Sequence, residues 1–214
     1  MVNFGTYRSL SAAVHGKDQG MKMLMRGLMQ IVIAAITLGG AVPPATADGS
    51  MTGQTVIEDF TMQPETHWRF FTDQVMGGVS TGGVAFAQEN GTPFARMTGR
   101  VSTANRGGFI QMRLDLASPP PQGTTGVQLV VRGNAQRYFV HLRTSGTLFP
   151  WQYYQTGFDV TESWSEVRLP LDGFTASGAL LRSVPRLTSL SSVAVVAYGR
   201  DHNAQIDVRE VNFY

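Results

Sequence analysis

The feature that most constrains the fold is an alternation of apolar and polar side chains over short segments, repeated along most of the chain. Within residues 109–116 every second side chain is apolar, namely Ile110, Met112, Leu114 and Leu116. A period of two places successive side chains on opposite faces of a β-strand. Beyond residue 48, no stretch of ten or more residues repeats apolar side chains with the helical period of 3.6. The pattern therefore predicts an all-β fold.

Turn-forming residues separate the predicted strands. Asn90-Gly91 lies between two apolar runs, as in a two-residue hairpin, and residues 118–123 (Ser-Pro-Pro-Pro-Gln-Gly) suit neither a strand nor a helix. Segment 192–198 is apolar almost throughout, which is typical of a central strand, and the pattern of 206–213 shifts once, which indicates a bulge. The predicted strands are 56–60, 94–101, 109–116, 127–131, 138–143, 151–158, 164–169, 192–198 and 206–213. Short strands with such turns favour an antiparallel β-sandwich over any α/β fold.

The N-terminal region has the pattern of a secretory signal peptide at residues 21–47. Lys22 and Arg26 precede the apolar run 31–42, and Ala45-Thr46-Ala47 provides small residues for cleavage. The run is too short to span a membrane, and no cysteine follows it for a lipid anchor. We therefore expect a periplasmic or secreted protein with no stable membrane anchor after cleavage.

The other domain boundaries follow from this assignment. Residues 1–20 do not fit the start of a signal peptide, so we expect them to be an extension ahead of a translation start at Met21 or Met23. Residues 48–55 are predicted to be a flexible linker, and 56–214 to form the β-sandwich.

Charge and composition exclude several functions. Residues 1–47 hold four of the 17 basic and one of the 15 acidic residues, which leaves 13 basic and 14 acidic residues in the mature chain. A nearly neutral chain does not suggest nucleic-acid binding, which needs a basic surface. The mature chain has no lysine and no cysteine, which excludes lysine-based and thiol catalysis, iron–sulfur clusters and disulfides. We expect no cofactor.

The most distinctive stretch is residues 68–83. It begins with Trp68 and two phenylalanines, passes through Asp73, and then contains four glycines within seven residues, 77–83. Glycine permits positive φ and close backbone approach. This stretch predicts an aromatic strand, a tightly folded loop and a second strand. One interpretation is that backbone geometry alone requires the glycines, and the other is that the loop has a binding function.

The run Asp73-Gln74-Val75-Met76-Gly77-Gly78-Val79-Ser80 resembles the signature D-x-V-M-G-G-x-S of the NADH:ubiquinone oxidoreductase (complex I) intermediate-associated protein 30 family. Further pieces follow in the family's order, from about residue 57 to residue 214: Trp68, Asn105-Arg106-Gly107-Gly108-Phe109, Arg113, Gly133, Arg137-Tyr138, Trp164, Val167-Arg168-Leu169-Pro170 and Phe174. The resemblance implies a galactose-binding-domain-like jelly roll. It also implies a binding or assembly-factor role, since mitochondrial members help to build the respiratory NADH dehydrogenase.

Polar residues of the middle strands are a second source of candidates. If these strands are neighbours, alternation places Gln111, Arg113, Gln128, Arg132, His141 and Arg143 on one sheet face opposite the core, near Gln152 or Tyr153. Such a face suits planar hydrogen bonding to hydroxyls, carboxylates or a peptide, but an antiparallel sheet also commonly has a plain solvated face. Trp68, Trp164 and Phe174 are assigned to the core, while Trp151 is left open as an exposed platform. The predicted binding residues are Asp73, Met76, Gly77, Gly78, Ser80, Asn105, Arg113, Arg137, Tyr138, His141, Arg143 and Tyr153.

Catalysis is not expected. Residues 78–82 match G-x-S-x-G, and Asp172 and His202 follow Ser80 in the order of a hydrolase triad. The nucleophile elbow must join a strand to a helix, however, and the residues after Gly82 alternate like a strand. The histidines lack the close spacing of metal ligands, so no metal site is predicted.

Two functions remain open. The first is a non-catalytic binding or assembly-factor module acting on a protein partner in the cell envelope, for which a respiratory-complex subunit is a candidate. The alternative is a carbohydrate-binding module that uses the polar face of the sheet.

Overall fold

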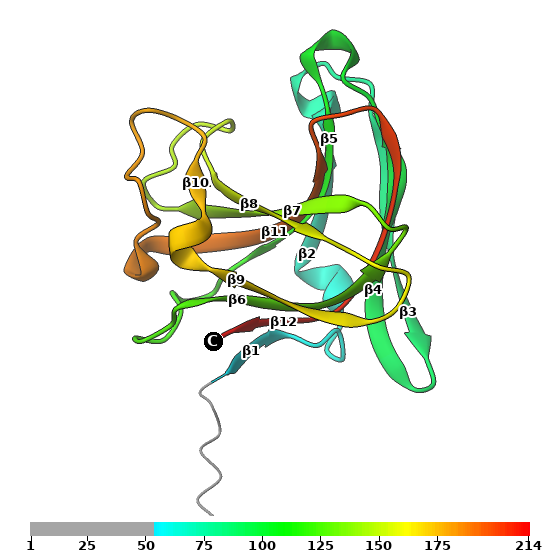
Figure 1. Cartoon of the computed structure of the whole chain (residues 1–214), viewed down its shortest axis with the longest axis horizontal. Coiled ribbons are helices and arrows are strands. Elements are labelled where there is room, and N and C mark those ends of the chain that lie inside the picture. Colours follow the sequence, from blue (N-terminus) through cyan, green and yellow to red (C-terminus); the bar gives the residue numbers. More distant parts are fainter. Residues whose placement is uncertain (1–53) are drawn as a thin grey trace, which may run out of the picture. The chain divides into compact units, whose positions relative to one another are not determined.

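The computed structural model describes residues 54–214, which form two six-stranded antiparallel sheets (Figure 1). Sheet A has the order β3-β4-β12-β6-β9, and β1 pairs with β12. Its strands are β1 (Thr55–Glu58), β3 (Thr81–Glu89), β4 (Thr92–Val101), β6 (Gly126–Gly133), β9 (Ser165–Pro170) and β12 (His202–Phe213). The predicted extension, signal peptide and residues 48–53 of the linker lie outside the described residues.

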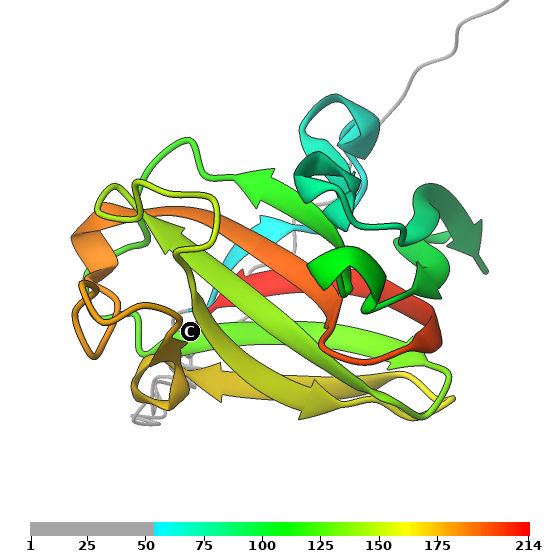
Figure 2. The same cartoon turned by 90° about the horizontal axis from the view of Figure 1, so that it is seen from above.

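Sheet B has the order β10-β8-β7-β11-β5-β2 and lies across the core from sheet A (Figure 1), and Figure 2 shows the strands of the two sheets from above. Its strands are β2 (Trp68–Thr72), β5 (Phe109–Asp115), β7 (Arg137–Thr144), β8 (Tyr154–Asp159), β10 (Thr175–Ala176) and β11 (Leu190–Tyr198). Five 3₁₀ turns connect strands: η1 (Pro64–Thr66), η2 (Asp73–Met76), η3 (Ala104–Arg106), η4 (Leu171–Gly173) and η5 (Leu187–Ser189). The described residues contain no α-helix, and accordingly none of their helical segments could cross a membrane.

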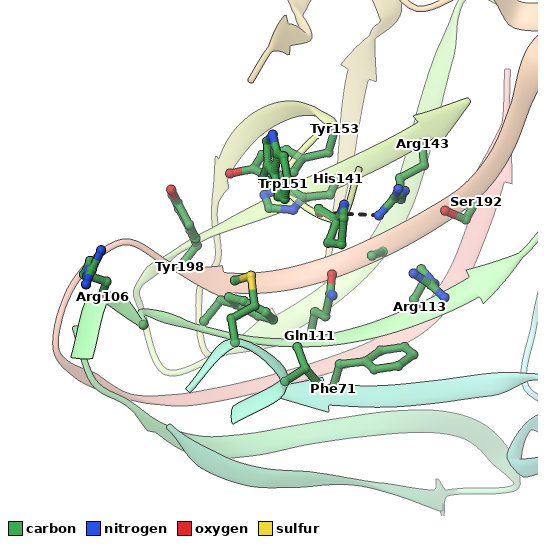
Figure 3. A pocket seen from close by; sticks show the side chains of 16 residues that line it. Phe71, Arg106, Gln111, Arg113, His141, Arg143, Trp151, Tyr153, Ser192 and Tyr198 are labelled. Atoms are coloured by element: carbon green, nitrogen blue, oxygen red, sulfur yellow. Dashed lines mark hydrogen bonds between the residues drawn. The ribbon is translucent and has the colours of Figure 1, made fainter. Parts of the chain in front are cut away.

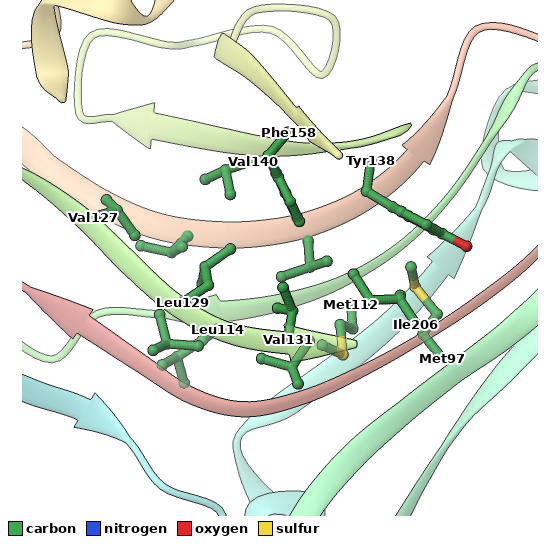
Figure 4. Packing of buried hydrophobic residues seen from close by; sticks show 14 of the residues in the cluster. Met97, Met112, Leu114, Val127, Leu129, Val131, Tyr138, Val140, Phe158 and Ile206 are labelled. Atoms are coloured by element: carbon green, nitrogen blue, oxygen red, sulfur yellow. The ribbon is translucent and has the colours of Figure 1, made fainter. Parts of the chain in front are cut away.

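The hydrophobic core lies between the two sheets (Figure 4). It is built from the apolar members of the alternating pattern, so that Met97, Leu129 and Ile206 of sheet A pack in the same cluster as Met112 and Val140 of sheet B. All five are completely buried. Each such side chain contributes about 1.5–3 kcal/mol through burial. The predicted all-β sandwich is therefore confirmed, and its stability rests on this core.

Three local predictions are confirmed. Asn90 and Gly91 connect β3 and β4 as a two-residue hairpin and both have positive φ, 51° and 77°. The register of β12 against β6 shifts between Val208 and Glu210, which is the predicted bulge. The strand at 192–198 is β11, and it lies between β7 and β5 near the middle of sheet B.

Two predictions about aromatic residues were wrong. The strand expected at 151–158 begins only at Tyr154, because the side chain of Gln152 accepts hydrogen bonds from the backbone of Leu148 and Phe149 and closes a loop there. Trp164 lies outside the core: its ring packs on Phe94 on the outer face of sheet A, with centroids 5.8 Å apart. Trp68 and Phe174 do lie in the core.

Candidate functional site

The signature loop is organised around the buried carboxylate of Asp73. This carboxylate accepts hydrogen bonds from the backbone and hydroxyl of Ser80 and from the backbone N–H groups of Gly108 and Phe109. Burial alone would raise the pKa of Asp73, but these hydrogen bonds outweigh it and lower the pKa below its ordinary value. Asp73 therefore ties together three segments: η2, the start of β3 and the start of β5.

Two glycines of the family pattern make room for this carboxylate. A Cβ atom added to Gly78 would lie 2.3 Å from Cγ of Asp73, and one added to Gly107 would lie 2.4 Å from Oδ2. Any larger residue would displace the carboxylate from its donors. Gly77, by contrast, ends η2 with a φ of 87°, a conformation that favours glycine whatever the space around it. The signature is thus explained by loop geometry, and it sets the position of the neighbouring Val75 and Met76.

The outer face of sheet B carries a row of side chains that crosses five strands. Strand register aligns Arg69 of β2, Arg113 of β5, Ala194 of β11, His141 of β7 and Gln155 of β8. Because side chains alternate between the two faces of a strand, the residues immediately before and after each of these five point towards the core. The small side chain of Ala194 leaves a depression between Arg113 and His141.

A groove of about 460 Å³ lies over this depression (Figure 3). Its floor comes from β5, β7 and β11, and its sides come from η2, the η3 turn and the loop before β8. The residues that line it are Phe71, Val75, Met76, Arg106, Gly107, Phe109, Gln111, Arg113, His141, Arg143, Pro150, Trp151, Tyr153, Ser192, Ala194 and Tyr198. From here on, the groove means the space that these sixteen residues line.

One side of the groove is an aromatic stack around His141. Its imidazole lies flat against Tyr153, with centroids 4.0 Å apart and planes 8° apart, and Tyr198 meets it edge-on at 5.8 Å. Burial lowers the pKa of His141 from 6.5 to about 3, so the ring is neutral at physiological pH. The Gln155 side chain opposes this shift by raising the pKa of His141, but within residues 54–214 the buried Nε2 atom has no partner with the geometry of a hydrogen bond. Burial and the adjacent Tyr198 raise the pKa of Tyr153.

The other side of the groove is cationic. The guanidinium of Arg113 lies over the ring of Phe71, 4.8 Å from its centroid, and its Nε is 3.2 Å from Oδ1 of Asp115. Asp115 also pairs with Arg69, which is directly opposite Arg113 on β2. Burial, together with the positive charges of Arg69 and Arg143, lowers the pKa of Arg113. The sheet thus holds a partly buried cation beside two others.

Arg143 supports the loop that forms one edge of the groove. Its guanidinium donates to the carbonyl oxygens of Thr147 (2.9 Å), Phe149 (3.0 Å) and Pro150 (3.4 Å). Burial lowers the pKa of Arg143. The loop presents Phe149 and Trp151 as a stacked pair, with centroids 4.9 Å apart and planes 2° apart. Trp151 is 60% exposed, as the platform interpretation of this residue requires.

The structure separates the twelve predicted binding residues into groups. Five line the groove: Met76, Arg113, His141, Arg143 and Tyr153. Three are buried, with hydrogen bonds inside the chain, and are not exposed to a ligand: Asp73, Ser80 and Tyr138. Four lie outside the lining, namely Gly77, Gly78, Asn105 and Arg137. Ligand contact by the first group stays a prediction.

Sequence reasoning placed Gln128 and Arg132 on the same face as Arg113, and this was wrong. Both residues belong to β6, which lies in sheet A, so they are on the opposite side of the molecule from the groove. Gln128 is buried and pairs with Gln54, while Arg132 binds Asp207 and Glu89. Alternation identified the outward side chains but not the sheet that contains them.

Other residues of the groove were missed. Ser192, Ala194 and Tyr198 face outward from β11, but that strand is apolar on both faces, so its alternation is hidden. Trp151 was noted only as a platform, and Arg106 only as part of the family pattern. The small size of Ala194 and Ser192 within a run of valines was a signal that could have located the floor of the groove.

The geometry expected of a hydrolase is not present around Ser80. β3 begins at Thr81, directly after it, and the Ser80 hydroxyl is fully buried and bonded to Asp73. Within residues 54–214, no three histidine, aspartate or glutamate side chains are grouped as metal ligands would be.

Comparison with known proteins agrees with this architecture. The sequence model of the family described as "Complex I intermediate-associated protein 30 (CIA30)" matches residues 58–202. A search of curated protein sequences gives no match.

Solved structures of low sequence identity share the fold. The family 11 carbohydrate-binding module of the cellulosomal cellulase Lic26A-Cel5E of Clostridium thermocellum superposes with a TM-score of 0.62 at 11% identity, over 75% of this chain and 94% of the module. A family 11 module from the same organism, in complex with a β-1,3-1,4-mixed-linked tetrasaccharide, gives 0.61 at 9% identity, with the same coverage of both chains. At these identities the similarity establishes a shared β-sandwich.

Proposed function

The chain belongs to the complex I intermediate-associated protein 30 family, and from this premise we propose that it is a non-catalytic module that binds a protein partner in the cell envelope through the groove of sheet B. The signal-peptide pattern of residues 21–47 supports the envelope location in this proposal. A subunit of a respiratory complex is a candidate partner, by analogy with the family name.

The distribution of exposed apolar side chains carries this proposal. The described residues include ten large hydrophobic side chains that are exposed, and six of them lie in the two loops that flank the groove. Val75, Met76 and Val79 belong to the signature loop, and Leu148, Phe149 and Trp151 belong to the loop before β8. Concentrated exposed apolar surface is typical of a protein–protein contact.

Affinity capture from envelope extracts tests the proposal. The mature chain should retain a reproducible protein, and the double variant Met76→Ser/Trp151→Ser should lose it, because both substitutions remove apolar contact area at the edges of the groove. Leu180→Ser is the matched control, since Leu180 is 89% exposed but lies outside the lining of the groove. Capture that is unchanged in the double variant, or capture of no protein at all, would contradict the proposal.

A second candidate function is carbohydrate binding, which the stacked Phe149–Trp151 pair supports. A flat, exposed aromatic surface beside Gln111, Arg113 and Ser192 offers both a stacking plane and hydrogen-bond donors for a sugar ring. The shared fold with carbohydrate-binding modules adds only an analogy. Calorimetry with a β-1,3-1,4-mixed-linked tetrasaccharide tests it: binding that Trp151→Ala abolishes would favour sugar, and no heat at millimolar concentration would exclude this ligand.

A further inference from the structure

We propose that the groove recognises an acidic segment of the protein partner, with a carboxylate of that segment bound over Ala194 between Arg113 and His141. This inference rests on the proposed function and specifies the chemistry of the partner.

The charge of the groove is the first observation. Its sixteen lining residues include the three arginines Arg106, Arg113 and Arg143 but no aspartate or glutamate. A concave surface with charge of one sign concentrates ligands of the opposite sign. A neutral ligand could accept hydrogen bonds from these arginines but would not compensate their charge.

The pairing of Arg113 is the second observation. Asp115 is the carboxylate beside it, but Asp115 is half-exposed and is shared with Arg69. The Nε atom of Arg113 is buried and lies 3.2 Å from Oδ1 of Asp115, but within residues 54–214 it has no partner with the geometry of a hydrogen bond. One shared carboxylate cannot neutralise both guanidinium groups, so Arg113 retains positive charge in the groove that its side chain lines.

Arg143 adds a second incompletely compensated positive charge to the groove. Among the residues that the structure describes, its guanidinium donates to three backbone carbonyl oxygens and to no carboxylate. The hydrogen bonds fix the position of its charge without cancelling it. Arg143 and Arg113 both line the groove, and the positive charge of Arg143 helps to lower the pKa of Arg113.

His141 supplies a second, neutral hydrogen-bonding group. Strand register places Ala194 directly opposite both Arg113 and His141, on the strands to either side. Neighbouring Cβ atoms across such pairs are about 5 Å apart, so Arg113 and His141 flank a space about 10 Å wide. Figure 3 shows both side chains at this depression. The His141 ring is nine-tenths buried, and its Nε2 lacks a hydrogen-bond partner within residues 54–214. Because Nε2 is itself buried, it would donate to a carboxylate bound at Arg113 after a small movement of the ring.

The apolar edges favour a protein as the source of the carboxylate. Val75 and Met76 on one side and Pro150 and Trp151 on the other suit the apolar side chains of a peptide next to its acidic residue. A sugar acid would match the arginines and the aromatic rings but not the exposed Val75 and Met76.

The test uses fluorescence anisotropy of the mature chain with two labelled twelve-residue peptides, one alternating leucine and glutamate and the other leucine and glutamine. We expect the acidic peptide to bind about tenfold more tightly at low ionic strength, and we expect high salt to reduce that preference. Arg113→Gln should abolish the preference for the acidic peptide over the neutral one. Arg113→Lys should retain part of it, because a point charge remains without the planar donors.

Arg168→Gln is the matched control, because Arg168 is an exposed arginine of sheet A that lies outside the groove. It should leave the preference for the acidic peptide intact. An equal loss of preference in Arg168→Gln and Arg113→Gln would overturn the inference, since the effect would then reflect net charge alone.

The remaining outcomes separate this inference from the proposed function. Equal binding of both peptides, weakened by Met76→Ser/Trp151→Ser, would refute the acidic preference while leaving the protein-binding function in place. Trigalacturonic acid is the third probe: Arg113-dependent binding of it, with no peptide binding, would refute both the inference and the protein-binding function in favour of an acidic sugar. Binding of none of the three probes would overturn the inference, and the capture experiment would then decide the function independently.

Discussion

Both sheets carry arginines on their outer faces, but these arginines are paired with carboxylates on sheet A and only partly paired in the groove of sheet B. On sheet A, Asp207 lies directly between Arg96 and Arg132 and binds both, with distances of 2.7 Å to each of two nitrogens of Arg96 and 2.8 Å to Nε of Arg132. Arg132 also binds Glu89 and lies over the Trp164 ring, 4.5 Å from its centroid. The cations of this face therefore have carboxylate partners within the chain.

On sheet B, an arginine over an aromatic ring recurs without such compensation. Arg113 lies over Phe71 and shares Asp115 with Arg69, and Arg143 binds carbonyl oxygens. The comparison teaches that arginine on a sheet face is not in itself a sign of binding. What distinguishes the groove is that its positive charge is only partly compensated by carboxylates of residues 54–214. We expect a face with a purely structural role to pair its own ions.

The largest expected effect on the free energy of unfolding comes from neutralising the carboxylate that pairs with the arginines on each face. Asp207→Asn should lower the free energy of unfolding by about 3 kcal/mol, because Asp207 is buried and its loss leaves Arg96 and Arg132 without their shared partner. Asp115→Asn should cost only about 0–1 kcal/mol, since Asp115 is half-exposed. Urea denaturation at neutral pH measures both variants. Equal losses would refute the distinction between the two faces.

Acid should destabilise the two faces in different pH ranges. His141 has its pKa lowered to about 3 by burial, so between pH 6.5 and about 3 the unfolded chain binds a proton that the folded chain does not. Stability should therefore fall as the pH falls through this range, by about 2–3 kcal/mol at pH 4.5 relative to pH 7.5. His141→Phe should remove most of this slope while keeping the stack on Tyr153.

Two groups serve as controls for the titration. Burial of Asp207 opposes its ionisation, but hydrogen bonds from Arg96 and Arg132 outweigh burial and lower its pKa below the ordinary 3.8. The stability that ionised Asp207 contributes is therefore present above pH 3.8 and is lost only below it. His202 also has a pKa lowered by burial, and His202→Phe measures its smaller share. Wild-type and His141→Phe curves of equal slope between about pH 4.5 and 7.5 would show that the folded His141 titrates normally.

The smallest expected effect is the most informative about function. Arg113→Met should change the free energy of unfolding by less than about 1 kcal/mol, because methionine fills the volume of a cation that is incompletely paired. The same change at Arg132 should be clearly destabilising, since it leaves Asp207 and Glu89 with one cation fewer. Thermal unfolding of the two variants side by side provides the measurement. A large loss in Arg113→Met would mean that Arg113 has a structural role.

Much of the fold followed from the sequence alone because its signals are local. Alternation in 109–116 assigned Ile110 and Met112 to the core and Arg113 to the outside, since a strand directs neighbouring side chains to opposite faces whatever lies beside it. The hairpin at Asn90-Gly91 likewise depends only on the two residues that must adopt positive φ. The signature at residues 73–80 identified the loop and the family, although its carboxylate proved to be buried.

The order of the strands was decided only by the tertiary structure, and the groove depends on it. Arg113 and Arg132 both point away from the core, each from its own strand. Arg113 faces the groove because β5 pairs with β11, whereas Arg132 joins an ion-pair network because β6 pairs with β12. Alternation specifies how one strand divides its two faces, but many strand orders bury the same apolar faces equally well. The placement of Ala194 between Arg113 and His141 arises from that pairing, and no local pattern in the chain contains it.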